Sequence, residues 1–219
     1  MLRKFDVLPS EIGNIEALSS EFDAPTEGME SITPLLYQSG YVTIKGYERE
    51  AQLYTLDIPN SEVRIGLMKS LLPLYAPTKS GRGMTLAAKM SLSLKDDDID
   101  GALRQLQEYL LTVPYCNDAN TEAHYQQMLY IILSLLGQFT TIDVEVHTAT
   151  GRVDMVMQTR KALYLFELKL NKSAEAAMRQ IDLKDYASKF TLCGLPIVKV
   201  GINFDTERRT ISDWKVEGD

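Results

Sequence analysis

The sequence has few of the residues that mark secreted, zinc-binding or membrane proteins. Its 219 residues include only two cysteines, Cys116 and Cys193, and two histidines, His124 and His147. Neither CxxC nor a Cys/His zinc spacing occurs, so we expect free, partly buried thiols and structural or exposed histidines. No apolar run reaches the length of a membrane span, and residues 1–20 lack the apolar core of a signal peptide. We therefore expect a cytoplasmic protein with no membrane partner.

Positive charge is also scarce. Lys and Arg number 23 against 30 Asp and Glu, which gives a net charge of −7. This balance argues against a tight nonspecific nucleic-acid binder, because phosphate contacts require clustered Lys and Arg. It still allows an enzyme that meets nucleic acid through a metal ion and a local basic patch. A phosphate-binding loop is missing as well: "SGRGMT" at 80–85 lacks the required lysine and spacing, so we expect no ATP site in this chain.

Hydropathy and turn signals divide the chain into three parts. Residues 1–30 are acidic without clear periodicity, and we interpret them as a linker or short helix with loose ends. Residues 31–118 begin with a hairpin followed by a helix, the pattern of a winged-helix-like module, and continue with two more helices. Residues 119–219 predict a helix, three strands, a helix and one or two strands. This order predicts an α/β domain whose mixed sheet has helices on its faces.

Charged residues interrupt two strands that otherwise look buried, "RVDMVMQ" and "ALYLFELKL". Alternation puts Glu167 and Lys169 on one face of the second strand. If the two strands pair as a hairpin, Asp154 comes close to Glu167. Neighbouring carboxylates raise each other's pKa unless a cation lies between them, and Mg²⁺ accepts one or two carboxylates while keeping water and substrate oxygens. A lysine two residues along can orient or deprotonate water, or stabilise charge on a phosphate.

Plainer interpretations of these charges stay open at this point. Asp154 can end a strand and pair with Arg152 or Arg160 at the surface. Glu167 and Lys169 can form an exposed pair on a half-solvated sheet, which would contribute little to stability.

The pattern resembles the PD-(D/E)XK nuclease superfamily. Asp154, a gap of 12 residues and then Glu167-Leu168-Lys169 is similar to its acid-then-(D/E)-X-K signature, and the preceding "GR" matches the Gly-Arg-x-Asp form of one branch. "FELKLNKSAEAAMRQIDLKDYASKF" resembles the C-terminal nuclease-like domain of AAA-ATPase-like proteins, whose helix carries a glutamine and a tyrosine; these match Gln180 and Tyr186. "LLYQSGYVTIKGY" and its continuation to residue 75 resemble the end of the ATPase-like region in the same proteins.

The resemblance implies a restriction-endonuclease-like α-β-β-β-α-β core that hydrolyses DNA phosphodiester bonds with Mg²⁺, or Mn²⁺ as a substitute. It implies partners too: nucleic acid, most simply DNA, and an upstream AAA-ATPase-like domain, while a homodimer is compatible with the sequence. The alternative is a catalytically weak nuclease-like fold that serves as an interaction or regulatory module for the ATPase. The implied metal ligands are Asp154, Glu167 and Glu122, the implied catalytic residues also include Lys169 and Gln180, and the implied nucleic-acid contacts are Arg152 and Lys184.

Several of these residues also have structural interpretations. Glu122 favours the dipole of its helix in a first turn. Gln180 faces the sheet and needs a hydrogen-bond partner there, whether or not it reaches the site. Lys184 can be a solvated lysine, and Tyr186 is expected in the core.

Overall fold

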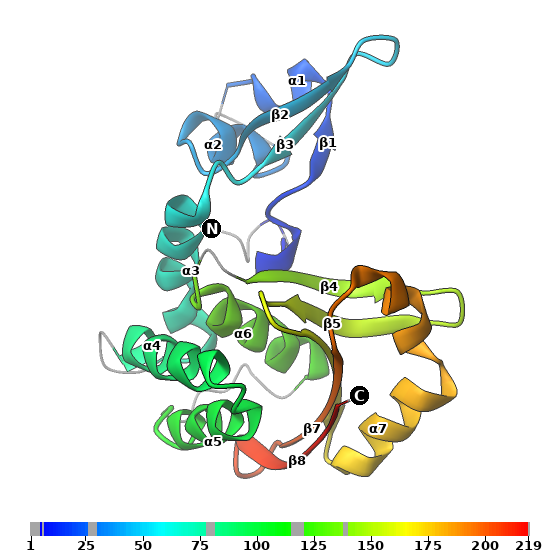
Figure 1. The fold of residues 1–219 in the computed structure, drawn as a ribbon. Helices are drawn as coiled ribbons and strands as arrows, with labels where there is room; N and C mark the ends of the chain where they lie inside the picture. The colour runs from blue at the N-terminus through cyan, green and yellow to red at the C-terminus, as the bar shows by residue number, and fades with distance from the viewer. Residues whose placement is uncertain are drawn as a thin grey trace. The chain divides into compact units, whose positions relative to one another are not determined.

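Two β-sheets organise the chain, and the computed structural model describes residues 5, 7–25, 30–77, 82–114, 121–137 and 140–218. Figure 1 labels the strands of each sheet. The chain divides into two units, Met1–Leu71 and Leu72–Asp219. The division falls inside one helix, and each unit contains one of the sheets.

The first unit has a three-stranded antiparallel sheet in the order β1-β3-β2. The predicted hairpin is present, followed by the predicted helix, and Asn60 accepts a hydrogen bond from the Val63 amide at 2.9 Å at that helix's start. Residues 7–25, interpreted from the sequence as a linker or short helix, contribute β1 to the sheet. The elements are η2 (Pro9–Glu11), β1 (Ile15–Ala17), α1 (Ser19–Phe22), α2 (Thr33–Gln38), β2 (Thr43–Glu48), β3 (Leu53–Asp57) and α3 (Ser61–Tyr75).

The second unit has a five-stranded mixed sheet in the order β4-β5-β6-β7-β8. Only β6 and β7 pair in parallel, because α7 carries the chain from one to the other; the remaining neighbours are antiparallel. The predicted mixed α/β class is therefore confirmed. The elements are α4 (Arg82–Lys95), α5 (Ile99–Leu110), α6 (Glu122–Ser134), β4 (Thr141–His147), β5 (Arg152–Gln158), β6 (Leu163–Leu170), α7 (Ala174–Leu183), η3 (Tyr186–Cys193), β7 (Ile197–Asp205) and β8 (Thr210–Gly218).

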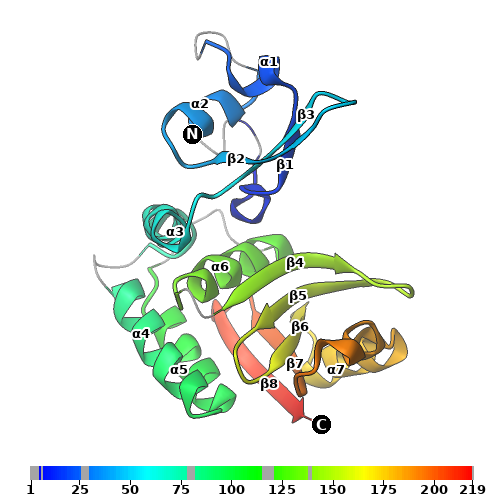
Figure 2. The same cartoon turned by 45° about the horizontal axis from the view of Figure 1, so that its top comes forward.

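Helices cover both faces of this sheet. Figures 1 and 2 show α6 on one side of the strands and α7 on the other. Leu163 and Leu165 of β6 join an apolar cluster with Met178 and Ile181 of α7. By strand alternation, Glu167 lies on this α7 face, further along β6. None of the helices that the structure describes is long and apolar enough to cross a membrane.

The N-terminus of α7 is held against the strands by close packing and by a carboxylate. A Cβ atom on Gly201 of β7 would lie 2.7 Å from the Ala174 carbonyl oxygen and 3.0 Å from the Ala177 Cβ, so glycine permits the close approach. Asp213 of β8 accepts a hydrogen bond from the Ala174 amide at 2.7 Å. Gly201 pairs with Glu167 in the β6–β7 register. The start of α7 is therefore fixed directly beside Glu167.

Gly201→Ala should destabilise the second unit by about 1–3 kcal/mol, because the added methyl group pushes α7 away from the sheet. Gly218→Ala is the control: its Cβ would meet Val198 at 3.8 Å, an ordinary contact, and its effect should stay within about 0.5 kcal/mol. Urea unfolding followed by circular dichroism measures both. Equal stability of the two variants would contradict the close packing of α7.

Candidate active site

The register of β5 and β6 brings the two predicted acids together. Met155 pairs with Phe166 and Val156 with Leu165. One step further along the same register, Asp154 lies opposite Glu167. Directly opposed residues of an antiparallel pair point to the same face and have Cβ atoms about 5 Å apart. Two carboxylates therefore share one face at the end of the paired region.

Glu167 and Lys169 form a buried ion pair. Glu167 is 0% exposed and Lys169 is 8% exposed, so the exposed-pair interpretation does not hold. The Lys169 Nζ lies 2.7 Å from Glu167 Oε1 and also donates to the Leu168 carbonyl oxygen at 3.0 Å. Among the described residues, Glu167 Oε2 is buried without a hydrogen-bond partner. One oxygen of this carboxylate thus contacts the lysine ammonium group, and the other contacts no hydrogen-bond donor among the described residues.

Asp154 is held by two hydrogen bonds rather than by the surface pairing with Arg152 that the sequence left open. Its Oδ2 accepts a hydrogen bond from the Leu168 amide at 2.7 Å. Its own carbonyl oxygen accepts one from the Gln126 side chain of α6 at 3.0 Å. Arg152 instead forms an ion pair with Glu145 at 3.1 Å. The carboxylate is therefore fixed to the same strand that carries Glu167 and Lys169.

Burial and mutual repulsion shift the titration of the acids. Burial, followed by the charge of Asp154, raises the pKa of Glu167 to about 7, although Lys169 opposes the shift. The pKa of Asp154 is also raised, chiefly by burial, and the Leu168 amide and Lys169 oppose that shift. Glu122, exposed at the start of α6, adds to both shifts through its charge. The three predicted acids therefore act on one another electrostatically.

Gln180 and its neighbours form a separate polar contact. The Gln180 side chain donates to the Tyr186 hydroxyl at 3.4 Å, and Tyr186 is buried in the core as expected. A Cβ atom on Gly151 would lie 3.2 Å from that hydroxyl and 3.4 Å from the Lys184 side chain. Lys184 itself is exposed, and its carbonyl oxygen accepts a hydrogen bond from the Thr150 hydroxyl. These contacts connect the end of α7 to the β4–β5 turn.

His124 stacks on Tyr75 with ring centroids 5.3 Å apart, and His147 is exposed. Cys193 is a free thiol that is exposed, although the sequence suggested partial burial. Cys116 lies outside the described residues.

The paired acids fit a hard divalent cation with few protein ligands. The described part of the chain contains no group of three or more His, Cys, Asp and Glu side chains arranged to hold a metal ion. Mg²⁺ does not require such a group, because it binds through one or two carboxylates and keeps several waters. The buried, unpartnered Oε2 of Glu167 is the type of donor that a cation would satisfy. Asp154 and Glu167 therefore suit Mg²⁺ or Mn²⁺.

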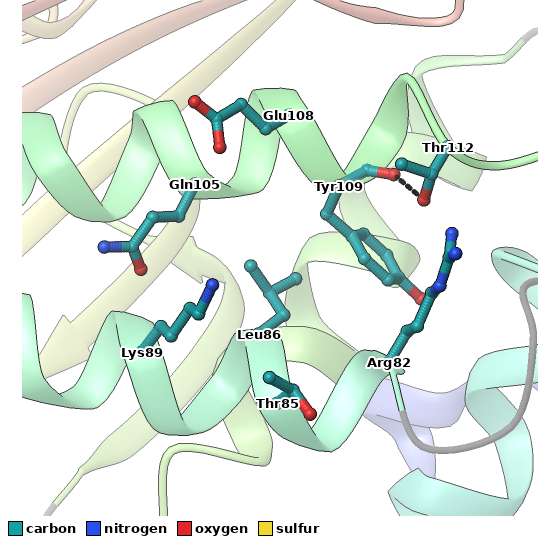
Figure 3. Close-up of a pocket in the computed structure, with 8 residues that line it drawn as sticks. All are labelled: Arg82, Thr85, Leu86, Lys89, Gln105, Glu108, Tyr109 and Thr112. Carbon is teal, nitrogen blue, oxygen red and sulfur yellow. Dashed lines mark hydrogen bonds between the residues drawn. The ribbon is translucent and has the colours of Figure 1, made fainter.

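A surface hollow of about 560 Å³ between α4 and α5 is unrelated to these acids (Figure 3). Across it, Arg82 and Lys89 of α4 face Gln105 and Tyr109 of α5. None of the predicted site residues lines it.

Two residues that hold the acids escaped the sequence interpretation. Gln126 gave one local signal, as a polar side chain just before the apolar run that ends its helix. Gly201 gave none, because the glycine is one of 13 in the chain and its contact with α7 is nonlocal.

Comparisons with known proteins match the region of the chain that carries these acids. Residues 120–214 match the model of a family described as PD-(D/E)XK nuclease superfamily. This region has the α6-β4-β5-β6-α7-β7 order of a restriction-endonuclease-like fold. Residues 120–214 are therefore similar to the PD-(D/E)XK nuclease superfamily, and this similarity indicates a nuclease-type domain.

A longer relative extends the similarity to almost the whole chain. The "Uncharacterized protein in vnfD 5'region" of Azotobacter chroococcum mcd 1 is 30% identical to this chain over an alignment of 226 residues. The alignment covers 98% of this chain. The chain spans 42% of that relative's length.

The raised pKa of Glu167 should make the metal-free protein less stable as the pH rises. Between about pH 4.5 and 7 folded Glu167 keeps a proton that the unfolded chain releases. The contribution of protonated Glu167 to the free energy of unfolding is complete below pH 4.5 and is lost as the pH rises through 7. Wild-type protein in EDTA should therefore lose more Tm between pH 5 and pH 8 than Glu167→Gln does.

Thermal unfolding at the two pH values measures this difference. Glu108→Gln, at an exposed position of α5, is the control and should follow the wild type. If Glu167→Gln showed the wild-type loss of Tm, Glu167 would not titrate in this range.

Proposed function

We propose that residues 119–219 form a Mg²⁺-dependent nuclease domain that hydrolyses DNA phosphodiester bonds. The observation that carries this proposal is the buried contact of Lys169 with Glu167, beside Asp154. Similarity to the superfamily supports the reaction class, and the unpartnered Glu167 oxygen supports a cation.

Asp154 and Glu167 would hold the metal ion, and Glu122 would assist from the start of α6. When bound, the cation lowers the pKa of a water molecule and neutralises charge that develops on the phosphate. The protein's own contribution is to keep the two carboxylates close and shielded from bulk water. The hydrogen bond from the Leu168 amide fixes Asp154, and the packing of α7 at Gly201 fixes the neighbourhood of Glu167.

Lys169 would orient or activate the attacking water. Its ammonium group is held by Glu167 Oε1 and the Leu168 carbonyl oxygen, so its position is set before substrate arrives. A preorganised cation of this kind also stabilises negative charge on a phosphate in the transition state. Gln180 would act from outside the Asp154–Glu167 pair. It would orient water or support the β4–β5 turn through its hydrogen bond to Tyr186.

Basic side chains around the β4–β5 turn support nucleic-acid contact. Arg152 and Lys184 flank Gly151, and the Lys189 Nζ donates to the His147 carbonyl oxygen at 2.5 Å. Arg152 is half-exposed and Lys184 is exposed, so both are accessible to a phosphate backbone. Arg152 lies two residues from Asp154. These contacts would guide a strand past the acids in a chain that is acidic as a whole.

The proposal includes an AAA-ATPase-like partner domain in the same, cytoplasmic protein. The resemblance of residues 31–75 to the end of such a region supports it. The alternative is a regulatory module with little catalysis, which the net charge of −7 favours, since an acidic chain repels the phosphates of nucleic acid.

Glu167→Ala should abolish Mn²⁺ binding and metal-dependent cleavage of plasmid and single-stranded DNA. Lys169→Met should keep Mn²⁺ binding but lower the cleavage rate at least about 100-fold, because it removes only the group that acts on water. Lys199→Met is the matched control: this lysine also pairs with a carboxylate, Asp182, at 2.8 Å, but lies outside the site. Calorimetry and a cleavage assay measure the two effects.

The outcomes separate the two proposed functions. Cleavage that persists in purified Glu167→Ala would refute the assignment of the site. Wild-type protein that neither binds Mn²⁺ nor cuts DNA would favour the regulatory module. Mn²⁺ binding without cleavage would point to a missing ATPase part or a different nucleic acid.

A further inference from the structure

Asp154 lies at a gap in the hydrogen-bond ladder of its sheet. The β4–β5 pairs run from Val144–Met155 to Val146–Val153 and omit Glu145, which would face Asp154. Glu145 has a φ of 56°, a left-handed conformation that turns its backbone out of the regular strand. On the other side, the β5–β6 pairs stop at Met155. In the described sheet, Asp154 therefore pairs with no residue of β4 and with no residue of β6.

The side chain of Gln126 occupies this gap from α6. Its Nε2 donates to the Asp154 carbonyl oxygen at 3.0 Å, and Gln126 is only 7% exposed. A buried backbone carbonyl requires a partner, and here a helix side chain supplies it. The Oδ2 atom of the Asp154 side chain accepts a hydrogen bond from the Leu168 amide. Asp154 is therefore held at two points, by α6 through its backbone and by β6 through its carboxylate.

We propose that Gln126 is a positioning residue that sets the placement of the Asp154 carboxylate. This inference rests on the proposed function for its metal-binding consequence, but its effect on Asp154 does not require a metal ion. Gln126 also lies one helical turn after Glu122. The helix that carries Glu122 is therefore also hydrogen-bonded to the backbone of Asp154. The bond sets the distance between an acid on the helix and the acids on the sheet.

A second glutamine provides a matched control. Gln107 of α5 donates through its Nε2 to the Ile211 carbonyl oxygen of β8 at 2.7 Å. The chemistry is the same, a partly buried side-chain amide on a strand carbonyl. In the described part of the chain, neither Gln107 nor Ile211 is hydrogen-bonded to one of the predicted acids. A purely structural role for Gln126 predicts that both glutamines respond alike to replacement. A positioning role predicts changes at the site for Gln126 only.

The experiment compares Gln126→Met and Gln107→Met, which remove the donor and keep similar side-chain volume. In metal-free protein, amide hydrogen exchange at Leu168 should speed up at least about tenfold in Gln126→Met, because Asp154 no longer holds that amide in place. It should stay at the wild-type rate in Gln107→Met. Mn²⁺ affinity by calorimetry should fall about 10-fold in Gln126→Met alone, the usual effect of losing a partner that orients a metal ligand.

Each outcome decides the proposal. Unchanged Leu168 exchange in Gln126→Met, or equal effects of the two variants, would overturn it. Gln126→Glu keeps the side-chain length and lacks the donor when ionised, so it should reproduce the Leu168 effect. If both Gln126 variants fail to fold while Gln107→Met folds, the bond serves global stability and positioning is overturned. If wild type binds no Mn²⁺ but the exchange result holds, the metal proposal fails and the positioning of Asp154 stands.

Discussion

The antiparallel register of β5 and β6 is the constraint on which the rest of the second unit depends. Its last pair is Met155–Phe166, so Asp154 and Glu167 stand one step beyond that pair, on the same face of the sheet. Burial of two acids is costly unless charge or hydrogen bonds compensate. Lys169 compensates Glu167, the Leu168 amide compensates Asp154, and α6 and α7 close the two faces. The surrounding contacts can be understood as the means of keeping this pair in place.

One buried carboxylate oxygen of this pair has no hydrogen-bond donor among the described residues. A buried acceptor without a partner costs about 1–3 kcal/mol, and Glu167 Oε2 is such an acceptor among the described residues. A core selected for stability alone would contain an apolar residue at this position. Unfavourable local energetics of this kind concentrate at functional sites, where activity and maximal stability are in conflict. The similarity of residues 120–214 to a nuclease superfamily is consistent with a functional reason for this cost.

Much of the second unit could be predicted from sequence because its signals are local. Alternation in β6 indicated which face carries Glu167 and Lys169, and a short hairpin connection implied that Asp154 lies nearby. The sequence "SAEAAMRQIDLKDYASKF" at 173–190 contains no glycine or proline and is typical of one continuous helix. In the structure α7 ends at Leu183, and Asp185 adopts a left-handed conformation just after it. The three-residue strand β1 was too short to show a period. Gln126 and Gly201 depend on contacts between distant segments, which a single sequence does not reveal.

The role of Asp213 gives β8 more importance than an edge strand usually has. The elements from α6 to β7 already contain all the acids of the proposed site, so a fragment ending after β7 would appear complete. Such a fragment would lack the Asp213 carboxylate, which accepts a hydrogen bond from the Ala174 amide. Asn203 of β7 would also lose its hydrogen bonds to Ser212 and Asp213. The first turn of α7 would then be free to fray beside Glu167. The smallest piece of this domain that keeps its chemistry therefore includes the hairpin from β7 into β8.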